Sequence, residues 1–308
     1  DVSVEGDATE LAAELAEELG AKLIVHRRFG TAALKLAGDQ VDLVTARKEV
    51  YSRPGALPKV SPGALTDDLA RRDFSINALA LPMRATDSGV IDPHGGLNDM
   101  ANGIVRTLRR TSFFDDPTRM LRAVRYEQRL GFDLDNSTLS DLSDAVCAGV
   151  MTAVSGDRCR RELDRVLNET DPGKALIRAV ELRILAAIHP ALSRVDILKR
   201  IISSPNPSPS SYLVGLVYPL SKTEGEAVIG RLKLSNQRAK LVRDTIWLRE
   251  NEQKLRGAIS TSSKLAVSLA GVDSEALMAV AVLADDQQVR QGLQRYIVEL
   301  RTVSSRLS

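Results

Sequence analysis

The sequence predicts an α+β protein in which a mixed head is followed by helices alone. Two observations predict this class. Short runs of alternating apolar and polar residues, typical of strands, occur before Ser112. From Ser112 onward one helical pattern follows another, interrupted mainly by the Pro/Ser-rich stretch at 203–211. Strands first and helices afterwards indicate an α+β head joined to a helical body.

The composition narrows the class of protein. The chain has 308 residues, enough for more than one hydrophobic core, and 27% of them are charged. No apolar run is long enough to span a membrane, which predicts a soluble protein. The net charge of +2 is too small to indicate a nucleic-acid partner, but the excess of arginine over lysine favours a phosphate-bearing ligand. Two cysteines predict free thiols in a reducing, cytoplasmic compartment.

The first elements of the head are a strand, a helix and a hairpin. Residues 1–4, "DVSV", alternate as a strand does. Because the chain opens there without an initiator Met, we expect it to be a segment of a longer polypeptide. The stretch "GDATELAAELAEELG" predicts a helix with Asp7 as its N-cap and Gly20 as its stop. The β-type runs on either side of Gly38 predict a hairpin.

The rest of the head is expected to be loop-rich. Residues 47–65 carry three prolines and two glycines, which predicts a long mobile loop. A short helix in "LTDDLARRD" then leads to "RRDFSINALAL", where two arginines, an aspartate and an asparagine stand against an apolar run. The stretches "INALALPM" and "GVID" predict a further hairpin.

The stretch "FFDDPTRMLRAVRYEQRLGF" predicts a helix with a cationic face. Asp116 and Pro117 suit its start and Gly131 its end. Four arginines fall within an arc of about 120°, and these are Arg119, Arg122, Arg125 and Arg129. A solvated face usually mixes charge signs, whereas the only acid of this helix, Glu127, lies off that face. We therefore favour an anion site over a solvated surface.

Two carboxylates on predicted strands suggest a metal site. Asp42 interrupts an apolar strand, and Asp1 faces away from its apolar neighbours, Val2 and Val4. A solvent-facing strand residue is the alternative for either carboxylate alone. Near a cationic face the two suggest magnesium, because Mg²⁺ takes one or two carboxylates together with the phosphates of a nucleotide.

Several stretches together resemble the bacterial-type (class II) tRNA nucleotidyltransferases, or CCA-adding enzymes, and their poly(A) polymerase relatives. They are "DVSVEGDA", "HRRFGTA", "VDLVTARKEVYSRPGALP", "DDLARRDFSINALAL", "IDPHGGLNDMANGIVRTL" and "FFDDPTRMLRAVRYEQRLGF". The resemblance covers residues 1 to about 170 in the family's order and spacing. It implies a polymerase-β-type nucleotidyltransferase head over 1–110, incomplete at its N-terminus. A helical neck over 111–172, a body over 173–256 and a tail over 257–308 would follow.

The resemblance also implies roles for residues of the head. Asp1 matches the second Asp of the Asp-x-Asp pair that holds two Mg²⁺ ions, and Asp42 matches the third acid. The first Asp of the pair, and the Gly-rich loop before it, are not in this chain. Asp73 and Asn77 would recognise the 2′-hydroxyl of the sugar, with Arg72 near the triphosphate.

Asp116 and Arg119 match the pair that reads the incoming base, and Arg122 and Arg125 would contact phosphates. The chemistry suits this assignment, because cytosine and adenine both place an exocyclic amine beside a ring acceptor. A carboxylate accepts from the amine while a guanidinium donates to the ring. Uracil presents a carbonyl where the amine should be, and it is rejected. The family often has Glu where this chain has Asp115.

The expected function is template-independent addition of CMP or AMP to the 3′ end of tRNA, with CTP, ATP and Mg²⁺ as partners. The RNA 3′-hydroxyl would attack the α-phosphate and release pyrophosphate. Full CCA addition, CC addition, A addition and poly(A) synthesis share the same head, and the sequence does not separate them. An inactive RNA-binding module without the first metal ligand is the alternative from another class. The basic run at 231–243 fits either RNA backbone contacts or a solvated helix.

Overall fold

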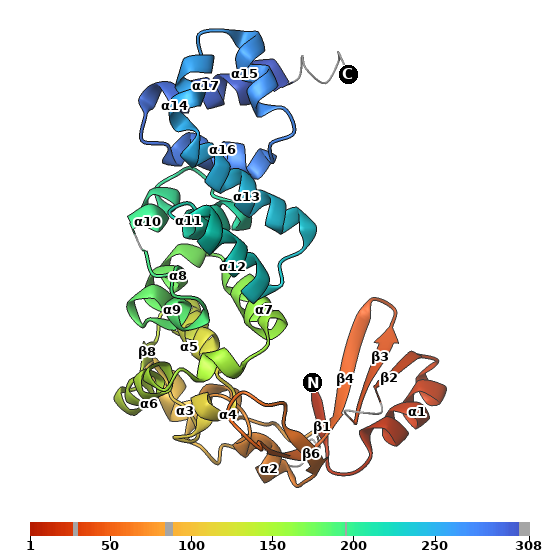
Figure 1. Ribbon diagram of the computed structural model, residues 1–308. Coiled ribbons are helices and arrows are strands. Elements are labelled where there is room, and N and C mark those ends of the chain that lie inside the picture. Colours follow the sequence, from red (N-terminus) through yellow and green to blue (C-terminus); the bar gives the residue numbers. More distant parts are fainter. Residues whose placement is uncertain (27–29, 84–88, 195, 302–308) are drawn as a thin grey trace. The chain divides into compact units, whose positions relative to one another are not determined.

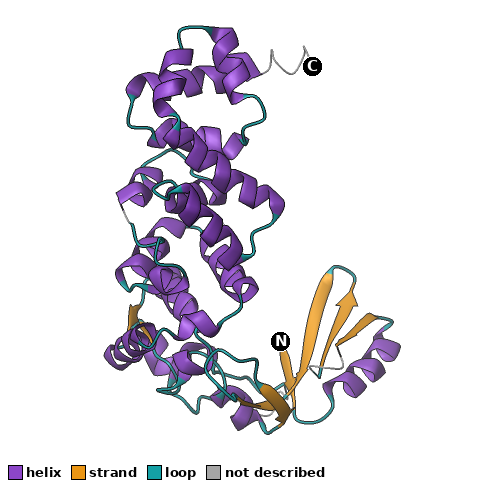
Figure 2. Ribbon diagram, viewed as in Figure 1, coloured by secondary structure: helices purple, strands orange, loops and turns teal. Residues whose placement is uncertain are grey.

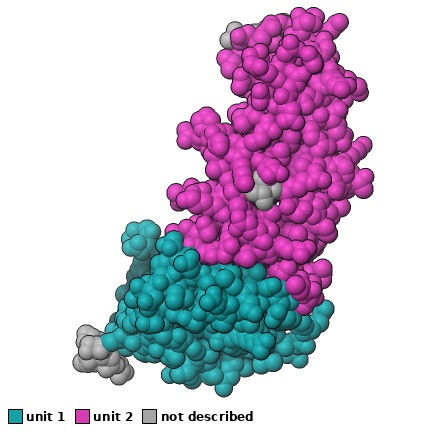
Figure 3. Space-filling model, turned by 90° about the vertical axis from the view of Figure 1, so that its left-hand side faces the viewer, with its two compact units in different colours: residues 1–119, 130–145 teal, residues 120–129, 146–308 magenta. Residues whose placement is uncertain are grey.

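The computed structural model describes residues 1–26, 30–83, 89–194 and 196–301. Part of the "HRRFGTA" stretch, at 27–29, therefore lies outside the described residues. The chain divides into two compact units, coloured separately in Figure 3. Unit 1 contains residues 1–119 and 130–145, and unit 2 contains 120–129 and the residues from 146 onward. The four parts expected from the resemblance divide the chain more finely, and their boundaries stay predictions.

Unit 1 begins with a four-stranded sheet in the order β1-β4-β3-β2 (Figures 1 and 2). Its strands are β1 (Val2–Val4), β2 (Lys22–His26), β3 (Thr31–Leu36) and β4 (Asp39–Thr45). β3 pairs with β2 and β4 in antiparallel fashion, so the hairpin predicted around Gly38 is confirmed. β1 joins the sheet in parallel beside β4.

Helix α1 (Ala8–Leu19) packs on one face of this sheet. As predicted, Asp7 caps its start by accepting from two backbone N–H groups, and Gly20 ends it in the left-handed conformation. The core between helix and sheet consists of buried small and branched residues, namely Ala8, Ala12, Ala32, Leu34 and Leu43. Because strand side chains alternate between the two faces, the residues next to these core positions point to the face that α1 does not cover.

The prediction of a mobile loop over 47–65 is wrong, because this segment forms a second small sheet. Strands β5 (Arg47–Val50) and β6 (Lys59–Pro62) pair in antiparallel fashion. The prolines do not prevent this pairing. Pro54 and Pro58 fall in the connection between the strands, and Pro62 ends a two-stranded ladder whose outer edges need no N–H donor.

Short elements complete unit 1. They are α2 (Leu65–Ala70), a 3₁₀ turn (Ser75–Asn77), α3 (Gly96–Ala101), β7 (Ile104–Val105), α4 (Ser112–Asp115), β8 (Asp133–Leu134) and most of α6 (Asn136–Cys147). The hairpin predicted after Ile76 is reduced to one bridge between Ala80 and Ile91, and residues 84–88 lie outside the described residues. The β signal also does not end at Ser112, because β8 pairs with β7.

The arginine-rich helix is α5 (Arg119–Leu130). It ends before Gly131, which has a φ of 65°, as predicted. It begins two residues later than the sequence predicted, because the carboxylate of Asp116 binds the backbone N–H of Thr118 and holds the chain in a turn.

The described part of unit 2 is helical, as predicted. After a 3₁₀ turn (Val150–Ala153) come α7 (Gly156–Leu167), α8 (Pro172–Glu181), α9 (Ile184–Ile188), α10 (Asp196–Ile202), α11 (Pro209–Val217), α12 (Lys222–Leu232), α13 (Asn236–Glu250), α14 (Glu252–Ala258), α15 (Ser262–Leu269), α16 (Ser274–Leu283), α17 (Gln287–Arg295) and a π-helical turn (Tyr296–Leu300). No single helix of the described residues could cross a membrane; only the bent pair α15 and α16 passes by length and composition.

The basic run at 231–243 forms contacts within unit 2. The guanidinium of Arg231 donates to three backbone carbonyls, those of Ile188, Val154 and Met151, at 3.2, 3.0 and 2.9 Å. The other basic residues of the run form ion pairs, which are Lys233–Asp157, Arg238–Asp164, Lys240–Asp244 and Arg243–Glu226. Each cation of this run thus has a partner inside unit 2, and the run joins helices.

The contact between α7 and the end of α12 leads to a prediction about stability. A Cβ atom at Gly156 would lie 2.1 Å from the carbonyl oxygen of Arg231, whereas one at Gly230 would meet nothing within 4 Å. Gly156→Ala should therefore destabilise unit 2 by about 1–3 kcal/mol, the usual cost of overpacking. Gly230→Ala should stabilise it by roughly 0.5–1 kcal/mol, because Ala suits a helix interior better. Urea unfolding followed by the fluorescence of Trp247 measures both, and equal stabilities would contradict the contact.

Candidate functional site

The parallel pairing of β1 with β4 brings the two predicted carboxylates side by side. Val2 lies opposite Leu43, and Ser3 lies opposite Val44. Continued back by one residue on each strand, this register sets Asp1 beside Asp42. Neighbouring strands are about 4.8 Å apart, and residues opposite each other point to the same face. Since Leu43 faces α1, both carboxylates project from the uncovered face. Gln40, on the same face, donates to Asp42 through Nε2 at 2.8 Å.

This pair fits a hard divalent cation. Adjacent carboxylates supply the oxygen ligands that Mg²⁺ prefers, and Mg²⁺ keeps its other positions for water and substrate phosphates. No group of three or more His, Cys, Asp or Glu residues in the described ranges could hold a metal ion. A cation at this face would therefore take two ligands from the described chain.

Asp68 organises the arginines that precede Asp73. Its carboxylate is only 1% exposed and accepts from two successive residues. Arg71 donates through Nε at 2.9 Å and Nη2 at 2.7 Å, and Arg72 donates through Nη2 at 3.2 Å. Sequence reasoning did not single out Asp68, although its spacing of three and four residues from the arginines is the helical pattern for such pairs.

Arg72 has a buried donor atom without an acceptor in the described chain. Its Nη1 donates to the backbone carbonyl of Asn77 at 3.3 Å, and its Nη2 is held by Asp68. Its Nε is buried and, within the described chain, has no hydrogen-bond acceptor. A buried unsatisfied donor costs free energy unless a ligand supplies the acceptor, so this atom suits the triphosphate role that the resemblance implies for Arg72.

Asp73 and Asn77 lie together: Asp73 precedes the 3₁₀ turn (Ser75–Asn77), and Asn77 is its last residue. The side-chain amide of Asn77 donates to Oδ1 of Asp73 at 3.0 Å, and the backbone N–H of Phe74 donates to the same oxygen at 3.0 Å. The carboxylate is thus fixed by two donors and is 6% exposed. The structure therefore brings together the two residues predicted to recognise the sugar.

Arg119 is buried against the segment that carries Arg71 and Arg72. Its Nη2 donates to the carbonyl of Arg71 at 2.7 Å, and its Nη1 donates to the carbonyl of Arg72 at 3.3 Å. Nη1 also donates to the hydroxyl of Ser112 at 2.7 Å. Arg119 therefore caps the C-terminal carbonyls of α2, which brings this predicted base-reading residue next to the predicted triphosphate residue.

Tyr51 belongs to the same neighbourhood, although sequence reasoning missed it. Its hydroxyl donates to Glu49 at 2.9 Å. Burial raises the pKa of the Tyr51 phenol far above its ordinary value, and the charge of Glu49 adds to this, while Arg119 opposes it. The phenol therefore stays protonated and acts as a donor. No local signal marked it, since it lies in the segment predicted to be a mobile loop.

The remaining arginines of α5 belong to unit 2, and two of them share an acid. Arg125 is 7% exposed and donates to Glu169 at 3.2 Å, and Arg129 donates to the same carboxylate through Nε at 2.8 Å. The guanidinium groups of Arg122, Arg125 and Arg129 lie 5.9, 4.9 and 5.9 Å from the ring centre of Tyr126. Glu169 therefore neutralises part of the cationic face, which the sequence prediction overlooked because it counted only acids of the same helix. The phosphate roles of Arg122 and Arg125 stay predictions.

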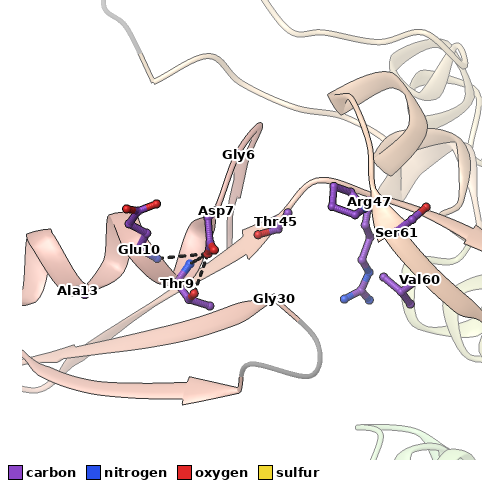
Figure 4. A pocket seen from close by; sticks show the side chains of 11 residues that line it. Gly6, Asp7, Thr9, Glu10, Ala13, Gly30, Thr45, Arg47, Val60 and Ser61 are labelled. Atoms are coloured by element: carbon purple, nitrogen blue, oxygen red, sulfur yellow. Dashed lines mark hydrogen bonds between the residues drawn. The ribbon is translucent and has the colours of Figure 1, made fainter.

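A cavity of about 810 Å³ in unit 1 has a different lining (Figure 4). Its wall combines the start of α1 with the ends of β4 and β6, and none of the predicted site residues lines it. The backbone N–H groups at the start of α1 are already bound. That of Ala8 donates to Thr45 at 3.0 Å, and those of Thr9 and Glu10 donate to Asp7. This helix start is therefore not available to an anion.

Comparison with known proteins tests the family resemblance that the sequence motifs suggested. Residues 1–106 match the family model of the poly A polymerase head domain. The resemblance to tRNA nucleotidyltransferases is confirmed.

Curated relatives of this kind come from several bacteria. The A-adding tRNA nucleotidyltransferase of Geobacter sulfurreducens is 40% identical over 212 residues, which are 66% of this chain and 24% of that protein. The A-adding enzyme of Halalkalibacterium halodurans is 38% identical over 192 residues, 61% of this chain and 45% of its own. The CC-adding enzyme of Deinococcus radiodurans is 37% identical over 177 residues, which are 57% of this chain and 46% of that protein. The chain thus spans less than half the length of these relatives.

Solved structures confirm the fold class, a nucleotidyltransferase head followed by helices. A CCA-adding enzyme in an apo form has a TM-score of 0.82 at 27% identity, covering 96% of this chain and 74% of that one. A CCA-adding enzyme complexed with ATP has a TM-score of 0.79 at 25% identity, covering 97% and 72%. The Thermotoga maritima CCA-adding enzyme complexed with tRNA has a TM-score of 0.75 at 26% identity, covering 96% and 72%.

The shared carboxylate of Glu169 leads to a prediction about pH. Hydrogen bonds from Arg129, and then from Arg125, lower the pKa of Glu169. Its contribution to stability should be complete above about pH 4.3, the ordinary pKa of Glu in an unfolded chain, and should be lost as the pH falls through the lowered folded-state value. Glu169→Gln should therefore lose roughly 1.5–3 kcal/mol at pH 7, the usual range for hydrogen bonds to a charge, and progressively less in acid.

Urea unfolding of both proteins between pH 7 and pH 3, followed through Trp247, measures this difference. Glu226→Gln is the control, because the exposed pair of Glu226 with Arg243 is screened by solvent and should contribute little. A difference for Glu169→Gln that does not change with pH would contradict the role of its charge.

Proposed function

We propose that the full-length protein adds nucleotides to the 3′ end of tRNA, using ATP or CTP and releasing pyrophosphate. The observation that carries this proposal is the alignment of Asp1 with Asp42 on one face of the sheet. The same unit contains the linked residues Asp73 and Asn77, and it places Arg119 against the backbone of Arg72. The names of the relatives, which include A-adding, CC-adding and CCA-adding enzymes, support the same activity.

Each group has a role that its chemistry suits. Relatives of this family imply a divalent metal, and we propose that Asp1 and Asp42 hold Mg²⁺. When bound, the metal supplies Lewis-acid stabilisation of the charge that develops at the α-phosphate. The Nε donor of Arg72 binds the triphosphate, and Asp73 with Asn77 holds the sugar hydroxyl, so that the reacting phosphate is fixed in position.

The base is read by Asp116 and Arg119. The carboxylate accepts from the exocyclic amine of adenine or cytosine, while the guanidinium donates to the adjoining ring nitrogen. The bonds of Arg119 within the described chain use Nη1 and one hydrogen of Nη2. The Nε side of its guanidinium therefore donates to the base.

We favour A addition among the related activities. The A-adding relatives match at 40% over 212 residues, 44% over 170 residues and 38% over 192 residues, while the CC-adding relative matches at 37% over 177 residues. We place the reaction in the cytoplasm, where the free thiols of Cys147 and Cys159 would stay reduced.

The test is an incorporation assay with the full-length protein and Mg²⁺. The primers are tRNAs that end at the discriminator base, after C, or after CC, each supplied with ATP or CTP. Addition of one A to the primer ending in CC is expected. Addition of C residues to the shorter primers would reassign the activity to CC or CCA addition, and long A tails would indicate poly(A) synthesis. No incorporation on any primer would contradict the enzyme and support an RNA-binding module.

The metal role has its own test in Asp42→Asn. Loss of this ligand should weaken Mn²⁺ binding by more than the roughly 10–100-fold that loss of an outer partner costs, and nucleotide addition should fall with it. Mn²⁺ binding is measured by electron paramagnetic resonance in the absence of nucleotide. Asp39→Asn is the matched control, because it removes the same charge from the same strand on the other face. Equal Mn²⁺ affinity in the two variants would overturn the assignment.

A further inference from the structure

The hydroxyl of Thr118 fixes the carboxylate of Asp116. Thr118 is 5% exposed and donates twice to Oδ1 of Asp116, through its hydroxyl at 2.6 Å and its backbone N–H at 3.0 Å. Two donors on one oxygen set the plane of the carboxylate.

A second buried hydroxyl fixes Arg119 in the same way. Ser112 is 0% exposed, and its oxygen accepts from Nη1 of Arg119 at 2.7 Å. The other acceptor of Nη1, the carbonyl of Arg72, lies farther away at 3.3 Å. Ser112 therefore provides the shorter of the two bonds that hold this side of the guanidinium.

We propose that Thr118 and Ser112 are positioning residues that make the Asp116–Arg119 pair reject uracil. This inference rests on the proposed function, in which that pair reads the base. A carboxylate held by two donors cannot turn away from the carbonyl that uracil presents, so uracil meets an unrelieved repulsion between acceptors. A carboxylate free to rotate would relieve the repulsion, and a looser guanidinium would follow the wrong base.

The consequence is specific to one nucleotide. Adenine and cytosine form hydrogen bonds with the Asp116–Arg119 pair whether the pair is rigid or mobile, although these bonds are weaker when it is mobile. Uracil is excluded only while the pair is rigid. Loss of either hydroxyl should therefore raise the use of UTP relative to the accepted nucleotide. If the hydroxyl had a merely structural role, its loss would lower kcat/KM for all nucleotides by the same factor.

The experiment compares Thr118→Val with Thr118→Ser in the full-length protein. Valine keeps the branched shape without the hydroxyl, and serine keeps the hydroxyl. The measurement is kcat/KM for ATP, CTP and UTP on the tRNA primer that the wild-type protein extends. For Thr118→Val the preference for the accepted nucleotide over UTP should fall about tenfold, the order expected from losing one hydrogen bond to a charged group. Thr118→Ser should keep the wild-type preference.

An unchanged preference in Thr118→Val, or a parallel loss for all nucleotides, would overturn the inference. Circular dichroism shows whether each variant is folded. Ser112→Ala, which removes the other hydroxyl, decides the question by the same ratio if Thr118→Val does not fold. Failure of the wild-type protein to extend any primer is a separate result, which would remove the proposed function and this inference with it.

Discussion

The candidate site depends on one buried charge, the guanidinium of Arg119. It is 6% exposed, and its hydrogen bonds within the described chain go to neutral acceptors, two carbonyls and one hydroxyl. Burial of a charge is costly unless it is well hydrogen-bonded. Carbonyl groups meet this requirement and leave the positive charge in place, whereas a carboxylate would cancel it. Arg119 is therefore held against the end of α2 by groups that leave its positive charge uncancelled.

Other arginines of the chain are neutralised, and the contrast is informative. Arg71 is bound by Asp68 and Glu49, and Arg125 is bound by Glu169. Such pairs stabilise and orient the segments that carry them, but they leave little charge for a substrate. Arg72 is also paired with Asp68, but its Nε stays a buried donor without an acceptor in the described chain.

Local patterns in the sequence predicted what local forces determine. The caps of α1 at Asp7 and Gly20 were predictable, as was the orientation of Asp42, because capping and strand alternation depend on neighbouring residues. The pairing of β5 with β6 was missed, because a ladder depends on a partner that local composition does not reveal.

The same limit explains what was missed in the site. Glu169 reaches Arg129 across 40 residues of sequence, and Arg231 binds carbonyls more than 40 residues away. Ser112 accepts from Arg119, seven residues later in the chain, and nothing in the residue type of a serine marks it as a buried acceptor. Sequence patterns thus located the charged residues but could not show which of them are already neutralised.

That distinction also applies to the acids. Asp68, Glu49 and Glu169 each bind arginine and so serve the fold. Asp1 and Asp42 are different, because neither takes part in an ion pair with a described residue although the sheet places them side by side. Two adjacent carboxylates repel each other, and the usual relief is protonation of one or binding of a cation. The proposed divalent cation would satisfy both charges at once, and the parallel register of β1 and β4 is what would let the two carboxylates share it.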